Sequence, residues 1–249
     1  MPSSPPPPST AHLPPAVAAL AEERQLGRLE REFAPKRMHR LLLALYVVTL
    51  LQLLFFVVPG LAFLWWLRRT PEFSRKQAAK RLYLFEHGMI VHPRLGDTVT
   101  AIRWDSVRLY QEIVLKIVNG LPTTTTHTYT ALSSEVGHAG AAVTDFYADP
   151  EVWGPWMQDA VVRAQGRTVL EAVLAGETVA FGPFGVALAS LGAQGAGQLP
   201  WTNIRPFEVS AGVVRVLRRD TSTPWATVPV SDIANVGLFL NLAENLRQG

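Results

Sequence analysis

The stretch RLLLALYVVTLLQLLFFVVPGLAFLWWLRR, residues 40–69, decides the fold class of this chain. The 27 residues 41–67 within it carry no charge, and Thr49 and Gln52 are their only clearly polar side chains. About 20 such residues, as a helix, span the ~30 Å hydrocarbon core of a bilayer. A core helix of a globular protein would show a polar face, which this stretch lacks. The sequence therefore predicts a transmembrane helix over residues 41–67.

Two arrangements of this stretch fit its length. A single tilted helix would be about 40 Å long, and Pro59 would kink it near its end. A shallow re-entrant hairpin that turns at Pro59-Gly60 also fits. The basic flanks do not decide between them, because 6 Lys/Arg residues lie on either side of the stretch. Because the positive-inside rule compares these two numbers, equal flanks predict no orientation of the chain in the membrane.

The positive charge is concentrated around the apolar stretch. Residues 1–81 hold 12 Lys/Arg and 5 Asp/Glu, whereas residues 82–249 hold 11 Lys/Arg and 15 Asp/Glu. A basic patch for nucleic acid would be expected on the large domain, which is instead mildly acidic. We therefore predict no nucleic-acid partner, and interpret the basic flanks as topology signals or contacts with anionic lipid.

The rest of the chain changes to the periodicity of β structure. From residue 82 onward, short apolar runs alternate with turn signals such as Asn119-Gly120 and Ala211-Gly212. Asp149-Pro150 is typical of a helix start and is followed by about 15 residues of amphipathic pattern. A second set of strand-like runs, including residues 168–181, leads to a closing helix capped by Ser231 or Asp232.

These patterns divide the chain into six segments. Each of the last two ends in an amphipathic helix and contains one Trp-x-x-aliphatic element, which indicates a tandem duplication; a single larger all-β domain is the alternative. The predicted segments are a disordered Pro-rich tail (1–15), a short helix with a basic flank (16–40), the transmembrane segment (41–67), a basic connector (68–81), and two β-rich modules (82–166 and 167–249).

Several motifs together resemble a known family. They are LFEHGMIV, IRWDSVRLYQEI, TDFYADPEVWGP, GETVAFGPFGV, LPWTNI and VPVSDIANVGLFLNLAENL. The chain resembles a family of uncharacterised bacterial membrane proteins, a domain of unknown function in which a membrane segment precedes two pleckstrin-homology-like modules. The resemblance implies a mainly β (α+β) fold, with an N-terminal transmembrane helix and two small β-barrels, each closed by a C-terminal amphipathic helix. It implies no activity and carries over no functional residues.

Few residues have a pattern that indicates chemistry. The chain has no cysteine, which excludes disulfides and thiolate sites, and it has no HExxH, GxSxG or P-loop motif. We predict no catalytic, cofactor-binding or metal site, and no cofactor. Large aromatic residues at helix and strand spacing are typical of a core, which we predict for Trp104, Trp153, Trp156 and Trp201. The predicted contacts with anionic lipid are Arg68, Arg69, Arg75, Lys76, Lys80 and Arg81.

The sequence thus favours a non-enzymatic, membrane-anchored scaffold or binding protein that acts through tandem pleckstrin-homology-like modules. Its expected partners are membrane lipid and a protein whose identity the sequence does not give. The expected location is the bacterial plasma membrane, with the modules in the cytoplasm. The alternative function is an envelope enzyme with a site between the two modules.

Overall fold

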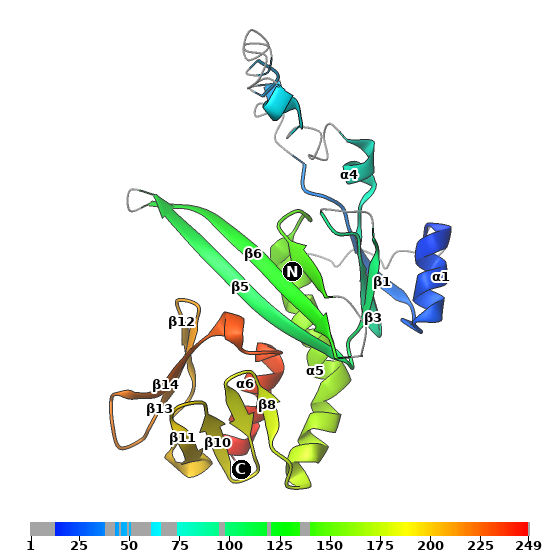
Figure 1. Cartoon of the computed structure of the whole chain (residues 1–249). Helices are drawn as coiled ribbons and strands as arrows, with labels where there is room; N and C mark the ends of the chain where they lie inside the picture. The colour runs from blue at the N-terminus through cyan, green and yellow to red at the C-terminus, as the bar shows by residue number, and fades with distance from the viewer. Residues whose placement is uncertain are drawn as a thin grey trace, which may run out of the picture.

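One order of elements occurs twice along the chain in the computed structural model (Figure 1). A four-stranded antiparallel sheet is followed by a tryptophan, a three-stranded antiparallel sheet and a helix. The structure describes residues 13–37, 43–44, 46–48, 50, 61–65, 74–94, 98–118, 121–134 and 140–248.

Within the described residues, the first module has seven strands and ends in the long helix α5. Its elements are β1 (Leu29–Phe33), β2 (Leu82–Phe85), β3 (Gly88–Val91), β4 (Thr100–Arg103), β5 (Val107–Val118), β6 (Leu121–Ser133), β7 (Ala141–Thr144) and α5 (Pro150–Leu174). Two further helices, α1 (Pro15–Glu23) and α4 (Arg75–Ala79), lie before and within it in sequence.

The second module repeats this order with shorter strands and two turns of 3₁₀-helix. Its elements are β8 (Val179–Phe181), β9 (Phe184–Val186), β10 (Ser190–Ala193), β11 (Gly197–Pro200), η2 (Trp201–Asn203), β12 (Glu208–Ser210), β13 (Val213–Leu217), β14 (Pro224–Pro229), η3 (Val230–Asp232) and α6 (Val236–Gln248).

The expected small barrels, of the pleckstrin-homology-like type, are wrong. The sheets have the orders β1-β2-β3-β4, β5-β6-β7, β11-β10-β9-β8 and β12-β13-β14, and in the described part of the chain none closes into a barrel. Closure requires strand pairing that continues around the whole sheet. Here the turn at Trp104 separates β4 from β5, and η2 separates β11 from β12, so each module is a pair of open sheets.

The core of the first module lies between its two sheets and the first half of α5. Trp104 and Trp153 are fully buried there, and Trp156 packs against the same cluster. The Trp104 and Trp156 rings meet edge to face with 5.8 Å between centroids, and Tyr129 and Trp153 do so at 5.3 Å. Such pairs stabilise a core beyond the area they bury. These aromatic contacts fix α5 against the sheets.

The sheet of β1–β4 is covered on both faces, which explains the unbroken burial of β2 and β3. One face contributes to the core under α5, and the other packs on α1 through Val17 and Ala21. The short helix expected within residues 16–40 corresponds to α1, which begins at Pro15. The helix ends at Glu23, and a turn with positive φ at Gln25 and Gly27 leads into β1. The chain needs this turn to bring Leu29 back under α1.

The prediction of a transmembrane helix over residues 41–67 is corrected by the structure. Among the described residues no helix is both long enough and apolar enough to cross a membrane. The membrane location predicted from that helix, with cytoplasmic modules, is corrected with it. Most of the stretch, including Pro59-Gly60, lies outside the described residues, so the proposed turn there is not tested.

Strand pairing gives the physical reason why a single crossing fails. β1 precedes the apolar stretch and β2 follows it, yet the two strands pair antiparallel, with Phe33 opposite Leu82. A single crossing would place them about 30 Å apart, on opposite sides of a bilayer. The aromatic rings of Tyr46 and Phe63 also lie 5.9 Å apart. The chain therefore leaves the sheet after β1 and returns to the same sheet at β2.

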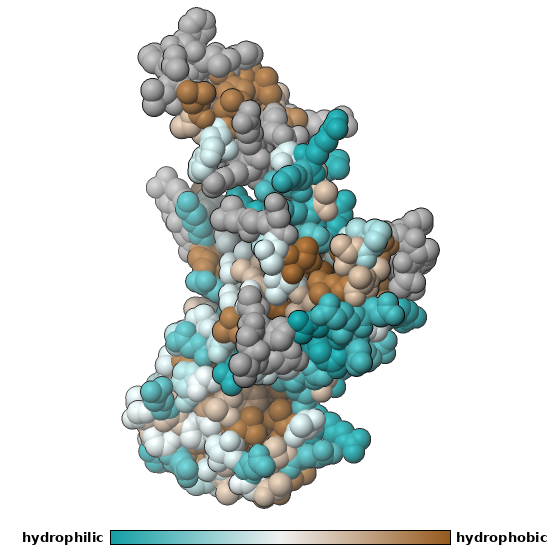
Figure 2. Space-filling view, turned by 45° about the vertical axis from the view of Figure 1, so that its right-hand side comes forward, coloured by the Kyte–Doolittle hydropathy of each residue, from teal (hydrophilic) through white to brown (hydrophobic). Residues whose placement is uncertain are grey.

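The described part of this excursion exposes apolar side chains. Figure 2 shows apolar residues gathered at the end of the molecule where Figure 1 places the helical residues 61–65. Val47, Val48, Leu61 and Trp65 are the large apolar residues exposed there. None of them belongs to the three hydrophobic clusters that form the described cores.

Helix α5 is longer than the sequence indicates, and both modules use it. The expected helix of about 15 residues extends to Leu174, so the expected strand character of residues 168–174 is wrong. Its first half packs on the first module through Trp153 and Met157, and Val173 near its end is buried in the core of the second. The expected module boundary at residues 166/167 falls inside this helix. One continuous helix therefore joins the two cores.

The second core contains Trp201, which is 5% exposed, and is closed by α6. The Phe239 ring of α6 stacks on Phe184 with 4.8 Å between centroids and a 4° interplanar angle. The closing helix begins at Val236, not after the expected caps Ser231 or Asp232, because Val230–Asp232 forms η3. This shift places Asn235 at the start of α6.

Candidate functional site

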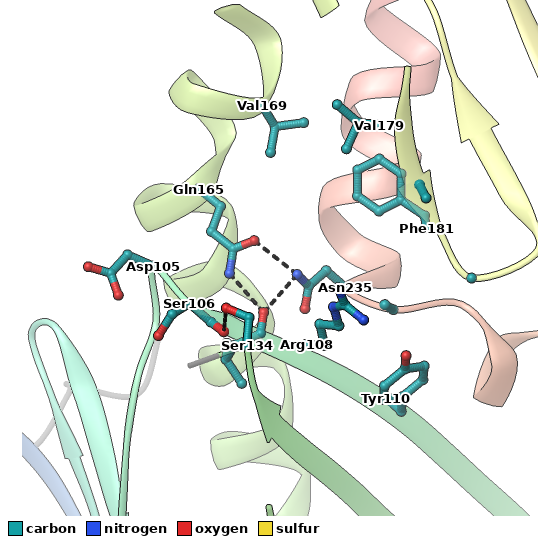
Figure 3. A pocket seen from close by; sticks show the side chains of 14 residues that line it. Asp105, Ser106, Arg108, Tyr110, Ser134, Gln165, Val169, Val179, Phe181 and Asn235 are labelled. Atoms are coloured by element: carbon teal, nitrogen blue, oxygen red, sulfur yellow. Dashed lines mark hydrogen bonds between the residues drawn. The ribbon is translucent and has the colours of Figure 1, made fainter. Parts of the chain in front are cut away.

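A cleft of about 390 Å³ lies where the two modules meet beside α5. Figure 3 shows its polar side chains facing its apolar ones across the gap. The polar lining consists of Asp105, Ser106, Arg108, Tyr110, Ser134, Gln165 and Asn235. The apolar side chains come mainly from α5 and β8, as Val169, Val179 and Phe181. Each module supplies one wall of the cleft, so its shape depends on how the modules are held together.

Asn235 holds the modules together from a buried position in the second module. Its side-chain oxygen accepts a hydrogen bond from the backbone amide of Leu109 at 2.7 Å. The backbone amide of Asn235 donates to the Leu109 carbonyl at 2.8 Å. Its side-chain nitrogen donates to the Val107 carbonyl and to Gln165 Oε1, both at 3.0 Å. Asn235 therefore extends the outer edge of β5 in place of a neighbouring strand. Its φ of 52° is left-handed, a conformation that asparagine tolerates better than most residues.

Gln165 completes this network from α5. Its Nε2 donates to the Trp104 carbonyl at 2.6 Å and to the Val107 carbonyl at 2.9 Å. A second glutamine bridge lies nearby, since Gln158 donates to Gln111 Oε1 at 3.2 Å and accepts from the Gly237 amide at 3.3 Å. Buried polar networks with all members satisfied favour one arrangement over others. The cleft is therefore preformed between fixed walls.

Gly182 lies where β8 turns into β9, against the backbone of η3. Its φ is +66°, and a Cβ added here would lie 2.0 Å from the Asp232 carbonyl oxygen. A side chain at this position would push η3 away from β8, and with it the adjoining wall of the cleft.

We expect Gly182→Ala to lower the free energy of unfolding by about 2 to 4 kcal/mol, since it combines left-handed strain with a backbone clash. Gly195→Ala is the matched control, because Gly195 has a φ of +81° but no atom within 4 Å of an added Cβ. Gly195→Ala should lower the free energy of unfolding only by the backbone strain, which is about 1 to 2 kcal/mol. Urea denaturation of both variants measures the difference, and equal losses would show that the close approach to Asp232 is unimportant.

The two charged residues of the cleft differ in their partners. Asp105 is held by Arg103, with 2.6 Å between Nη2 and Oδ2, and this guanidinium lowers the pKa of the carboxyl. Arg108 is exposed on β5 and lines the same cleft. No ion pair or hydrogen bond of its side chain occurs with the described residues. Arg108 is thus the charged group of the cleft that is available to a ligand.

A second hollow, also about 390 Å³, lies at the start of α5. His127 and Asp145 line it, with Nδ1 of the histidine 3.2 Å from Oδ1 of the carboxylate. The His127 amide also donates to Asp145 Oδ2 at 3.0 Å. Asp145 therefore satisfies the exposed edge of β6 beyond β7, a structural role that does not require a ligand.

The predicted lipid contacts are not equivalent in the structure. Arg68 and Arg69 lie outside the described residues, while Arg75 and Lys76 are exposed on α4. Lys80 is 5% exposed and donates to the Pro93 carbonyl at 2.6 Å. Arg81 pairs with Glu32 of β1 at 3.0 Å. Lys80 and Arg81 thus bond to segments that flank β2 on either side, and lipid contact stays a prediction for all six residues.

The four predicted core tryptophans lie in the two module cores, away from the cleft lining. Trp104 and Trp201 occupy corresponding places in the two modules, and each indole donates to a backbone carbonyl: Trp104 to Phe85 at 3.0 Å and Trp201 to Ala187 at 2.9 Å. The cleft residues Arg108, Gln165 and Asn235 were not singled out from the sequence. One available signal was Asn235 itself, a polar residue within the apolar pattern that opens the last helix.

Comparison with known proteins gives a family and no further relatives. No curated protein and no solved structure matches the chain significantly. A model of a family of unknown function, DUF6585, matches residues 15–249, which include both modules and the apolar stretch. The resemblance to a domain of unknown function is confirmed, whereas nothing in the match supports a membrane segment or pleckstrin-homology-like modules. The chain belongs to the DUF6585 family.

Proposed function

We propose that the protein is a non-enzymatic binding protein that holds an acidic group of a protein partner in the cleft between its two modules. The observation that carries this proposal is Arg108, an exposed guanidinium in the cleft without a partner among the described residues. Guanidinium groups bind carboxylates through paired hydrogen bonds, and these are stronger than bonds between neutral groups. Arg108 would therefore select a partner that presents aspartate or glutamate.

The surroundings of Arg108 support binding of a side chain rather than of a free ion. In Figure 3 Arg108 and Tyr110 lie on β5 below Val179 and Phe181. An acidic residue flanked by apolar neighbours would find both kinds of contact there. Because the network of Asn235 and Gln165 fixes the walls, little conformational entropy is lost when the partner binds.

The alternative, an enzyme with a site between the modules, has less support from the same residues. The pKa of Asp105 is lowered by its bond to Arg103, which makes this carboxylate a weak base. The amides of Gln165 and Asn235 are already engaged with backbone groups and with each other. These groups hold the cleft together and are not available for proton transfer.

Charge reversal at Arg108 tests the proposal. Three tagged proteins are compared as baits for binding partners: the native full chain and its variants Arg108→Glu and Arg205→Glu. Tetraglutamate serves as a soluble competitor. Arg205 is an exposed arginine outside the cleft, so both variants change the net charge equally. We expect the native chain and Arg205→Glu to retain the same partner, and tetraglutamate to displace it. Arg108→Glu should bind this partner with an affinity lower by about tenfold or more. Equal retention by both variants would contradict the proposal.

A further inference from the structure

The hairpin of β5 and β6 extends beyond the body of the first module (Figure 1). β7 pairs with β6 only from Thr128 to Ala131, so the outer part of the hairpin is a two-stranded ribbon. Ile113, Val114 and Leu115 are 43%, 48% and 52% exposed on this ribbon. A long strand with exposed apolar side chains and open backbone groups is a template for pairing with another chain.

The outer edge of β5 is open beyond Leu109. Both backbone groups of Leu109 point away from β6, since they bond to Asn235. Backbone groups alternate in direction along an antiparallel strand, so those of Gln111, Ile113 and Leu115 point to the same edge. Within the described residues, no backbone hydrogen bond reaches this edge past Leu109. The edge of β6 differs, because the Asp145 carboxylate already accepts from the His127 amide.

The open edge is complementary to itself. Residues 112–116 read Glu-Ile-Val-Leu-Lys, with opposite charges placed symmetrically about Val114. If two copies pair antiparallel with Val114 opposite Val114, each Glu112 lies opposite Lys116 of the other copy. Ile113 of each copy then lies opposite Leu115 of the other copy. The outward-pointing backbone groups of these residues form the hydrogen bonds between the two copies. Parallel pairing in register would instead place Glu112 beside Glu112 and Lys116 beside Lys116.

We infer that two copies of this chain associate through the outer edge of β5, as a two-fold symmetric dimer centred on Val114. The ribbons of both copies form one four-stranded sheet with the order β6-β5-β5-β6. One face of the joint carries the Val114 pair between two ion pairs, and the other carries two isoleucines and two leucines. Such a contact is isologous, so it closes at two copies.

Exchanging the two charges gives the first test. Glu112→Lys or Lys116→Glu alone places like charges opposite each other at both ends of the joint. Cross-strand pairs contribute roughly 0.2–1 kcal/mol each, so each single variant should raise the dimer dissociation constant about tenfold or more. The double variant restores both ion pairs and should return within about threefold of the native value. Glu177→Lys, an exposed site in the second module, controls for the change in net charge.

A cysteine at the centre gives the second test, because the chain has no native cysteine. In this register the Val114 residues form a non-hydrogen-bonded pair, with Cα atoms about 4.5 Å apart and within reach of a disulfide. Val114→Cys should form a covalent dimer under mild oxidation. Thr126→Cys is the matched control, since Thr126 lies opposite Val114 on β6, one strand further from the joint. The two residues at position 126 would therefore be about 14 Å apart, too far for a disulfide.

Sedimentation velocity over a range of concentrations of the full chain reads out both tests. A native chain that stays monomeric throughout would overturn the inference. So would a dimer that the single charge variants leave unchanged, or one in which Thr126→Cys cross-links as readily as Val114→Cys. The last result would place the contact on the edge of β6.

Discussion

Replacing Trp104 with alanine is expected to lower the free energy of unfolding by about 3 to 5 kcal/mol. The indole has no exposed surface and packs edge to face on Trp156 of α5. Its Nε1 donates to the Phe85 carbonyl at 3.0 Å. Alanine would leave a cavity between the two sheets and helix α5, and would remove the hydrogen bond to β2. Urea denaturation of the full chain, followed by far-ultraviolet circular dichroism, measures the loss.

Two further variants separate packing from hydrogen bonding at this position. Trp104→Phe keeps much of the ring volume and loses the Nε1 bond, so we expect a loss of about 1 to 2 kcal/mol. Trp225→Ala removes a half-buried indole from β14 and should also cost less than Trp104→Ala. If Trp104→Ala melted like the native chain, the ring could not be a structural element of the first core.

Local patterns were sufficient where a turn or helix start has its own sequence signal. The segment LFEHGMIV forms a hairpin between β2 and β3, with its turn at Glu86-His87. The Ala211-Gly212 turn is confirmed, with both residues at positive φ. The helix start at Pro150 is also confirmed, yet Asp149 makes no side-chain cap bond there. Such features depend on a few adjacent residues, and those residues are visible in the sequence.

Features that depend on distant residues could not be predicted. β1 has an ordinary helix-compatible composition, and its strand conformation comes from pairing with β2, which lies beyond the whole apolar stretch. Residues 168–174 contain β-branched side chains that favour a strand locally. Nevertheless, burial of Val173 in the second core keeps this segment helical. Tertiary packing overrides local propensity in both places.

The same limit applies to the cleft. Arg108 is one charged residue in an alternating strand, and the sequence does not show that the second module lies across from it. Asn235 bonds to Leu109, 126 positions away in sequence. The stronger local signals for a helix cap, Ser231 and Asp232, lie in η3, and Asn235 directly precedes α6 instead. A cleft between modules is built from contacts that no local pattern encodes.

Asn235→Ala is the most informative variant at this junction, and we expect it to lower the free energy of unfolding by about 3 to 5 kcal/mol. Alanine leaves the buried Leu109 amide and Gln165 Oε1 without their bonds to Asn235, and an unsatisfied buried group costs roughly 1–3 kcal/mol. The left-handed φ of 52° adds about 1 to 2 kcal/mol for alanine. Asn235→Gly removes the same bonds without that backbone strain, so it should be less destabilising than Asn235→Ala. Asn245→Ala, which loses one exposed bond to Asn241, serves as the control and should cost under about 0.5 kcal/mol.

A double-mutant cycle with Gln165→Ala then isolates the contact between α5 and Asn235. Because Gln165 and Asn235 share a hydrogen bond and both bond to the Val107 carbonyl, their losses should not add. We expect the double variant to be about 1 kcal/mol more stable than the sum of the two single losses predicts. Additive losses would mean that the helix and the second module hold β5 independently. The cleft would then lack the coupling between its walls on which its fixed shape depends.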